Sequence, residues 1–405
     1  MKSICFSLAS WRHGVHFFFQ IQSKPSACSF IVTSGTTSRM ATKNLNIGMI
    51  GYGFMGRAHS NAFHQAGHFF DLPFQLNLKV ICGRNQTKLE QTAAQWGWEE
   101  SEADWESVVS RADIDIVDIC TPNYLHEPIA VAAAEAGKMV LCEKPLANSV
   151  AAAARMAQAA RKIPTLVWFN YRRVPAVMFA HQLVQQGKLG EVNHYRAQYL
   201  QSWGRSADPT AWRFKPDEAG SGVLGDLLSH SLDLAIWLNG PIHRLCSSIH
   251  TFAEGRQVDD AVTLLAEFSN GSIGTFEASR FATGNLNRNC FEINGSTGSL
   301  EFNLEEMNHL NFTDLREDAS LQGRRKILVT GPGHPYVEHF WPPGHVIGYE
   351  HTFTATLVDF LDSVSKGERF HADFADAIEV QRILEAVVAS SERRKWIETD
   401  RAQSN

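Results

Sequence analysis

The stretch Gly51-Tyr-Gly-Phe-Met-Gly56 constrains the fold of this chain more than any other. The short apolar run 45–51 leads into it, and an amphipathic stretch, 57–66, follows. A G-x-G-x-x-G sequence between a strand and a helix is typical of a dinucleotide-binding unit. Gly51 allows a tight turn, Gly53 lets backbone approach a pyrophosphate, and Gly56 lets helix and strand pack closely. The spacing therefore predicts a dinucleotide held at a helix N-terminus.

Further apolar runs alternate with helical patterns as far as residue 170. The runs cover 76–82, 113–120, 139–142 and 165–170, with helical patterns at 126–136 and 149–161. Such alternation predicts βαβ units and a doubly wound parallel sheet in a Rossmann domain of residues 41–170. The run at 139 ends in Glu143-Lys144-Pro145, and open α/β sheets bind ligands at the carboxyl ends of their strands. Pro145 favours extended geometry at Lys144, which aims the ammonium group.

The second strand ends in Cys82-Gly83-Arg84-Asn85, where an acidic residue would bind the ribose 2′-hydroxyl of NAD. No acid is present, and an arginine at this point accommodates the 2′-phosphate of NADP. Alternatively, Arg84 stacks on adenine and the cofactor is NAD. The residues alone leave both readings open.

A different pattern follows residue 170 and predicts a second domain of residues 171–405. A helix at 175–186 precedes a strand at 191–199, and short runs follow at 261–268, 272–276, 289–294 and 298–303. Asn270-Gly271 is a tight hairpin signal. We expect an α+β domain with an open, mostly antiparallel sheet, one face of which needs cover. Helical patterns at 225–238, 349–366 and 374–394 could supply part of that cover.

Asp226 and His230 are the strongest candidates for proton transfer. They are four residues apart and so share a face of a helix, and the preceding stretch 220–225 is rich in glycine. A carboxylate beside an imidazole orients the ring and raises its basicity. The alternative is a hydrogen bond on a helix surface. Asp233, one turn further on, is expected to make a structural bond. His334, His339, His345 and His351 lack ligand spacing, so we expect no metal.

Taken together, these segments resemble the Gfo/Idh/MocA oxidoreductases over about residues 44–396. The matching segments, in the family's order, are Gly51 to Gly56, Thr121-Pro-Asn123 with His126, Cys142-Glu-Lys-Pro145, Asn170-Tyr-Arg172, and Asp226 to His230. Leu228 departs from the family, in which many members have glycine there. The resemblance implies Lys144, Asp226 and His230 as the catalytic group, with the order of proton transfer open. It implies cofactor contacts from Gly51, Gly53, Phe54, Met55, Gly56, Arg84, Thr121, Pro122, Asn123, His126, Glu143, Lys144 and Arg213.

Four further stretches look like sugar dehydrogenases of this family, which oxidise a ring hydroxyl of a pyranose or cyclitol with NAD. They are 169–176, 196–203 with 211–213, and 341–344. The likeness favours NAD over NADP and implies that Lys144, Tyr171, Gln201, Trp203 and His230 bind a sugar, anhydrosugar or inositol. Tyr199, Gln201 and Trp203 would alternate on one strand and share a face, although such residues could simply pack the sheet against a helix. An NAD-dependent glycoside hydrolase and a non-catalytic nucleotide sensor are the alternatives.

Composition limits the other possibilities. A net charge of -6 argues against a nucleic-acid partner, and no apolar run is long enough to span a membrane. Seven cysteines without framework spacing indicate a reducing, cytoplasmic compartment. Residues 1–40 contain no Asp or Glu and are expected to be a disordered extension or a targeting segment. The family resemblance implies a homo-oligomer, a dimer or tetramer.

Overall fold

A computed structural model of the protein describes residues 43–399. The expected extension of residues 1–40 lies outside this part of the chain. Among the helices of residues 43–399, none combines the length and apolarity needed to cross a membrane.

The first sheet has six strands, and each pair of neighbours is parallel. Its order is β3-β2-β1-β4-β5-β6, which is the doubly wound arrangement with a switch point between β1 and β4. Loops that follow strands on either side of this switch meet at one edge of the sheet. The strands are β1 (Lys43–Ile50), β2 (Phe74–Cys82), β3 (Glu100–Glu102), β4 (Ile116–Ile119), β5 (Met139–Cys142) and β6 (Thr165–Val167).

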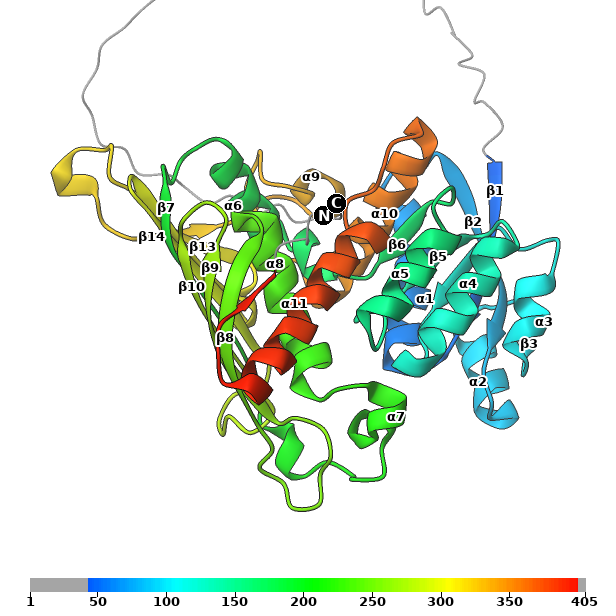
Figure 1. The fold of residues 1–405 in the computed structure, drawn as a ribbon. Helices are drawn as coiled ribbons and strands as arrows, with labels where there is room; N and C mark the ends of the chain where they lie inside the picture. The colour runs from blue at the N-terminus through cyan, green and yellow to red at the C-terminus, as the bar shows by residue number, and fades with distance from the viewer. Residues whose placement is uncertain (1–42, 400–405) are drawn as a thin grey trace, which may run out of the picture. The chain divides into compact units, whose positions relative to one another are not determined.

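Helices cover both faces of this sheet (Figure 1). They are α1 (Phe54–Phe69), α2 (Gln86–Trp96), α3 (Trp105–Ser110), α4 (His126–Glu135) and α5 (Val150–Ala159). Side-chain oxygens of Asn85, Asp104 and Ser149 accept backbone N–H groups at the starts of α2, α3 and α5. The sequence reading missed β3, α2 and α3, because β3 has only three residues and α2 and α3 bury only two side chains each.

The second sheet has nine strands in the order β14-β13-β12-β11-β7-β10-β9-β8-β15. Its neighbours are antiparallel except for β7 and β10, so the prediction of an open, mostly antiparallel sheet is confirmed. The predicted hairpin at Asn270-Gly271 joins β9 to β10, with Gly271 at φ 87°. The strands are β7 (Val192–Leu200), β8 (Ile242–His250), β9 (Ala261–Phe268), β10 (Ile273–Ser279), β11 (Arg288–Gly295), β12 (Gly298–Asn303), β13 (His309–Asp314), β14 (Arg325–Leu328) and β15 (Ile397–Glu398).

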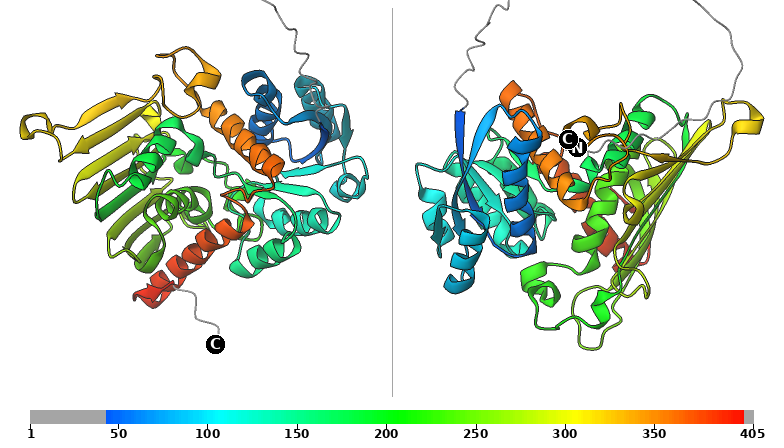
Figure 2. Two further views of the ribbon diagram at one scale, coloured as in Figure 1. Left: turned by 90° about the horizontal axis from the view of Figure 1, so that it is seen from above. Right: turned by 180° about the vertical axis from the view of Figure 1, so that it is seen from behind.

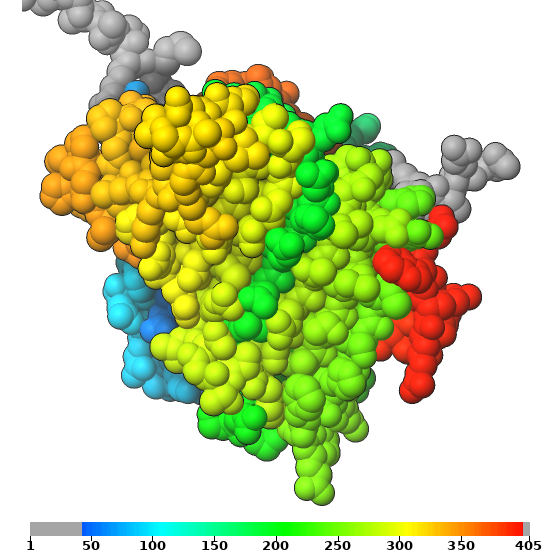
Figure 3. Space-filling view, turned by 90° about the vertical axis from the view of Figure 1, so that its left-hand side faces the viewer, coloured from blue at the N-terminus to red at the C-terminus, as the bar shows by residue number. Residues whose placement is uncertain are grey.

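One face of the second sheet packs against α6 (Pro175–Gln185), α8 (Ser229–Asn239) and α11 (Phe374–Arg393) (Figures 1 and 2). The predicted contribution of the helix at 349–366 is wrong, because this helix, α10 (Tyr349–Lys366), packs against α1 instead. The opposite face of the sheet forms an open surface (Figure 3), on which Leu265 and Ile273 are about half exposed. The expected homo-oligomer stays a prediction.

The C-terminal helices also return to the first sheet. α11 contacts α5, and the Val167 backbone N–H donates to the Ala372 carbonyl at 2.7 Å. Arg172 makes a buried, two-pronged contact with Asp233 on α8, which is the structural bond expected of this aspartate. The proposed division of the chain at residue 170 stays a prediction, since helical segments late in the chain pack against elements on both sides of it.

Candidate active site

A cavity of about 1020 Å³ lies where the loops after β1, β2, β4 and β5 approach the carboxyl end of β7. Most residues predicted from the sequence line it, and two predicted residues, Gly56 and His126, do not. The predicted residues in the lining are Gly51, Gly53, Phe54, Met55, Arg84, Thr121, Pro122, Asn123, Glu143, Lys144, Tyr171, Gln201, Trp203, Arg213, Asp226 and His230.

The stretch from Gly51 to Gly56, the glycine loop, has the geometry that its spacing predicts. Gly51 has φ 109°, and a Cβ there would lie 2.5 Å from the Cys120 carbonyl oxygen. A Cβ on Gly56 would lie 2.4 Å from the Gly51 carbonyl oxygen, so helix and strand could not pack as closely with any other residue. A Cβ on Gly53 would meet no atom of the described residues within 4 Å, and the first turn of α1 carries no acid. Free backbone donors therefore face an open space that suits an anion.

Some polar side chains of the loop after β4 bind other parts of the protein, whereas the hydroxyl of Thr121 is left without a partner beside the cavity. The Thr121 hydroxyl is buried and has no hydrogen-bond partner in the described structure. Asn123 donates its amide to the Ala219 carbonyl at 2.8 Å. His126 is fully buried, with Nδ1 3.0 Å from the Pro145 carbonyl and Nε2 3.1 Å from the Thr121 carbonyl. His126 therefore does not line the cavity, because its ring lies beneath the loops that do, and its predicted contact with the cofactor stays a prediction.

Lys144 lies at the junction between the two sheets. Its Nζ donates to the Asp226 carbonyl oxygen at 2.7 Å and to Asp226 Oδ1 at 3.2 Å. Its backbone N–H donates to Glu143 Oε2 at 3.1 Å, and the Lys144–Pro145 peptide is cis. The close approach depends on glycine, since a Cβ on Gly225 would lie 3.2 Å from Pro145 Cγ. The glycine-rich stretch thus has the role that the sequence predicts.

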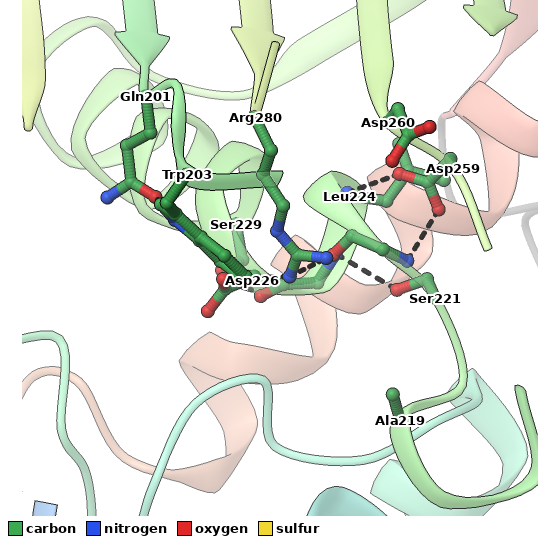
Figure 4. Close-up of polar contacts among 12 residues, drawn as sticks. Gln201, Trp203, Ala219, Ser221, Leu224, Asp226, Ser229, Asp259, Asp260 and Arg280 are labelled. Atoms are coloured by element: carbon green, nitrogen blue, oxygen red, sulfur yellow. Dashed lines mark hydrogen bonds and ion pairs between the residues drawn. The ribbon is translucent and has the colours of Figure 1, made fainter. Parts of the chain in front are cut away.

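Asp226 receives a second cation on its other oxygen. Arg280, which follows β10, donates from Nη2 to Asp226 Oδ2 at 2.8 Å (Figure 4). Burial would raise the pKa of Asp226, but the charges of Lys144, Arg280 and Arg213 hold that pKa far below its ordinary value. Asp226 is therefore an anion shared between two cations.

His230 faces the same cavity without a bond to Asp226. Its ring lies 4.5 Å from the Tyr171 ring, between centroids, and the side chain is 6% exposed. The predicted hydrogen-bonded pair is wrong: within residues 43–399, no hydrogen bond joins these side chains, and the two carboxylate oxygens accept from Lys144 and Arg280 instead. Burial, followed by the charge of Lys144, lowers the pKa of His230 well below its ordinary value, so the imidazole is neutral at pH 7.

A polar chain borders the cavity on the side of the second sheet. The Tyr171 and Tyr199 hydroxyls are 2.9 Å apart, and Asn287 Oδ1 accepts from Tyr199 and from Gln201 Nε2. Trp203 Nε1 donates in turn to Gln201 Oε1. The predicted placement on one strand is wrong, because β7 ends at Leu200 and Trp203 lies in the short 3-10 helix Trp203–Arg205. The side chains still converge on the cavity.

Sequence reasoning missed Arg280, Asn287 and Tyr349 in this lining. Arg280 and Asn287 both lie beside strand ends, in the stretches after β10 and before β11, and this position was their only signal. Tyr349 begins α10, which the sequence assigned to the other sheet. All three residues reach the cavity only because segments far apart in the chain pack together in the fold.

Beneath the cavity, His59 connects Glu143 to the interior of the first sheet. Its Nε2 lies 3.0 Å from Glu143 Oε1, and its Nδ1 lies 2.9 Å from Asp118 Oδ2 and 3.0 Å from Cys120 Sγ. Asp118 also accepts from Trp168 Nε1 at 2.9 Å. Although His59, Asp118 and Cys120 could supply three metal ligands, their mutual hydrogen bonds already engage the atoms concerned.

A doubly wound sheet and an open sheet that share one cavity define the class of two-part dinucleotide oxidoreductases. Residues 45–171 match the oxidoreductase family with an NAD-binding Rossmann fold, and residues 177–301 match the GFO/IDH/MocA C-terminal domain. The chain belongs to the GFO/IDH/MocA oxidoreductase family. This confirms the fold class and the nicotinamide cofactor, with NAD as the form that the family description names.

Two relatives share most of the chain. Levoglucosan dehydrogenase from Pseudarthrobacter phenanthrenivorans is 38% identical over 386 residues, which are 88% of this chain and 98% of that protein. An oxidoreductase domain protein from Kribbella flavida is 48% identical, with a TM-score of 0.86 over 89% of this chain and 100% of that one. A solved complex of levoglucosan dehydrogenase with NADH and levoglucosan has a TM-score of 0.85 at 39% identity, over 88% of this chain and 99% of that one.

Proposed function

We propose that this protein oxidises a ring secondary hydroxyl of a sugar, anhydrosugar or inositol to a ketone and passes the hydride to NAD. The observation that carries the proposal is one cavity lined both by the glycine loop of α1 and by Lys144, Asp226 and His230. The similarity to levoglucosan dehydrogenase over nearly the whole chain supports the substrate class.

The fit to a dinucleotide rests on groups in the N-terminal sheet. Three features suit a pyrophosphate and its riboses: the open space at Gly53, the acid-free start of α1, and the Thr121 hydroxyl, which has no hydrogen-bond partner within residues 43–399. Arg84 is exposed at the far end of the lining, where we expect its guanidinium to stack on adenine. When bound, NAD supplies the electrophilic ring carbon that takes up the hydride.

Oxidation of a neutral alcohol requires that its hydroxyl proton leave as the hydride is transferred. His230 is buried, neutral and without a hydrogen bond to Asp226, so its imidazole can accept this proton. An ammonium group has three donors, and Lys144 uses two of them on Asp226. The third can hold the substrate oxygen and stabilise the negative charge that develops on it. We therefore assign proton acceptance to His230 and oxygen binding to Lys144.

The polar chain on the opposite wall suits a polyol ring. Tyr171, Tyr199, Asn287 and Gln201 provide hydroxyl and amide groups for ring hydroxyls, and Trp203 provides an aromatic face for C–H surfaces. The pKa of Tyr171 is raised to about 12 by burial, so this hydroxyl remains protonated. Because Tyr199 donates its own proton to Asn287, Tyr171 donates to Tyr199, and the Tyr171 oxygen can accept from a ring hydroxyl. A pocket of this kind selects a neutral, hydroxyl-rich ring.

The test is a panel of anhydrosugars, pyranoses and inositols with NAD or NADP, in which absorbance of the reduced cofactor is followed. We expect turnover with at least one polyol, levoglucosan among the candidates, and a preference for NAD. Lys144→Met should lower kcat by about 10²- to 10³-fold with NAD still bound, because it removes the group that stabilises the negative charge on the substrate oxygen. Lys162→Met, on an exposed residue, is the matched control.

Absence of activity with every polyol would refute the proposal, as would near-normal turnover of Lys144→Met with NAD bound. Release of nitrophenol from an aryl glycoside without accumulation of NADH would indicate the glycoside hydrolase instead. Binding of NAD without any turnover would indicate a sensor. Neither alternative is favoured, because the relatives from Pseudarthrobacter phenanthrenivorans and Kribbella flavida both carry oxidoreductase names.

A further inference from the structure

Arg280 is an unusual residue to bury beside a reacting site. Its side chain is 1% exposed and lines the cavity. Nη2 donates to Asp226 Oδ2 at 2.8 Å and to the Gly222 carbonyl at 3.2 Å, whereas Nε and Nη1 have no partner among the described residues. Buried donors left unpaired cost free energy, so packing alone does not account for this arginine.

The neighbouring charges do not explain Arg280 either. Asp259 is close, but its two oxygens accept the Gly222 and Leu224 backbone N–H groups at 2.6 and 2.8 Å (Figure 4). Asp260 is paired with another arginine, Arg256. Asp226 is therefore the carboxylate that Arg280 contacts, and it is the same one that holds Lys144.

The flat face of Arg280 makes a second contact. Its guanidinium carbon lies 4.9 Å from the centre of the Trp203 ring and 5.6 Å from that of Phe214. Stacking on a guanidinium fixes the plane of an aromatic ring. Arg280 thus contacts both Asp226, the carboxylate beside Lys144, and the aromatic rings of Trp203 and Phe214 that line the cavity.

We propose that Arg280 is a positioning residue that holds Asp226 and Trp203 in register and keeps the group of Lys144, Asp226 and Arg280 at a net charge of +1. This inference rests on the proposed function and deepens it. One excess positive charge favours an alkoxide on the substrate oxygen. It also keeps His230 neutral, and therefore able to accept the substrate proton, down to a lower pH. Arg280 acts through Asp226 and Trp203, and not by touching the reacting atoms.

Two substitutions separate the charge from the shape. Arg280→Met removes the charge, so the acid limb of the pH profile of kcat/KM should move about one unit higher. Arg280→Lys retains the charge but loses the planar fork, so the limb should stay in place while KM for the polyol rises about tenfold. The charged and titratable groups that face Asp226 and Arg280 are Lys144, Arg213, His230, Glu143, Asp259, Tyr171, Tyr199 and Tyr349.

A second readout does not require turnover. Oxidised nicotinamide carries a positive charge that the reduced ring lacks, so loss of Arg280 should favour the oxidised form. We expect the ratio of Kd for NAD⁺ to Kd for NADH, measured by quenching of tryptophan fluorescence, to fall about threefold to tenfold in Arg280→Met. Arg280→Lys should keep the wild-type ratio. Arg280→Gln, neutral but still able to donate to Asp226, replaces Arg280→Met if the latter does not fold.

Arg256 provides the matched control. It lies 4.1 Å over the Phe214 ring and is paired with Asp260, but it does not line the cavity. Arg256→Met should lower stability without changing the pH profile or the Kd ratio. The proposal would be overturned if a neutral Arg280 variant kept both the wild-type acid limb of kcat/KM and the wild-type ratio of Kd for NAD⁺ to Kd for NADH. It would also be overturned if Arg280→Lys shifted the acid limb and the Kd ratio as much as Arg280→Met does. If wild type oxidises no polyol, the proposed function fails, and the Kd ratio still decides the role of Arg280.

Discussion

The buried contact of His59 with two carboxylates gives a sharp prediction about stability. The ring is fully buried, and its two nitrogens lie 2.9 Å from Asp118 and 3.0 Å from Glu143. A neutral imidazole has one N–H donor and cannot satisfy both acceptors, whereas imidazolium has two. Burial lowers the pKa of His59, but the charge of Asp118 and the hydrogen bond to it outweigh this and raise the pKa well above its ordinary value.

We expect His59→Leu to lose about 3–5 kcal/mol of unfolding free energy at pH 7, because it leaves two carboxylates without their shared cation. The folded variant can relieve this only if one carboxyl takes up a proton, and for an ordinary carboxyl group that costs about 4 kcal/mol at pH 7. The loss expected from two unpaired carboxylates therefore agrees with the cost of protonating one of them. Since the cost of protonation falls by about 1.4 kcal/mol per unit of decreasing pH, the deficit should shrink to roughly 1–2 kcal/mol at pH 5.

The stability of the wild-type protein should fall as the pH rises, because His59 binds its proton more tightly in the folded state than in the unfolded state. A raised folded pKa means that the stabilisation by His59 is fully present below about pH 6.5 and is lost as the pH rises through the folded pKa. His59→Leu should lack this loss. Guanidinium unfolding of the apo protein at pH 5 and pH 7 measures both effects, with His64→Leu, an exposed position on the same helix, as the control. A deficit below about 1 kcal/mol at pH 7, or one that grows at pH 5, would refute the reasoning.

Two further predictions concern the glycine loop and a buried ion pair. Gly53→Ala should have an unfolding free energy within about 0.5 kcal/mol of that of wild type yet bind NAD at least tenfold more weakly. Its Cβ would meet no atom of residues 43–399 within 4 Å and would enter the space proposed for the pyrophosphate. Gly56→Ala should instead destabilise the apo protein, because its Cβ would lie 2.4 Å from the Gly51 carbonyl oxygen; calorimetry and NAD titration separate the two. Asp233→Asn should cost about 3–5 kcal/mol by leaving Arg172 buried with a neutral partner, while the folded fraction keeps its kcat. Equal melting curves for Asp233→Asn and wild type would contradict that account.

The sequence predicted features that depend on local spacing. Gly51, Gly53 and Gly56 specify a turn and a close packing within a few residues, and the alternation of strands with helices specified the first sheet. The open sheet was predicted from the hairpin at Asn270-Gly271 and from short alternating runs. These signals lie within single elements or between neighbours, where the chain itself fixes the geometry.

Contacts between distant segments were not predictable in the same way. Asp226 and His230 were correctly placed in one cavity, but the choice between pairing with each other and pairing with Lys144 depends on segments 82 positions apart. The turn Leu224–Leu228 is a π-helix rather than part of a regular α-helix. Arg280 carried no motif, and α10 has a regular apolar period that does not say which sheet it covers. In each case, a competing partner from elsewhere in the chain decides the outcome.

Small residues matter as much as charged ones at the contact between Lys144 and Asp226. Lys144 reaches Asp226 only because the stretch that carries Asp226 passes close to Pro145 and to Asp259. A Cβ on Gly222 would lie 1.8 Å from the Asp259 carbonyl oxygen, and one on Gly225 would lie 2.8 Å from Ser221 Oγ and 3.2 Å from Pro145 Cγ. A larger residue at Gly222 would have to displace backbone and would carry Asp226 away from both cations. The charge pattern therefore depends on a backbone path that glycine alone permits.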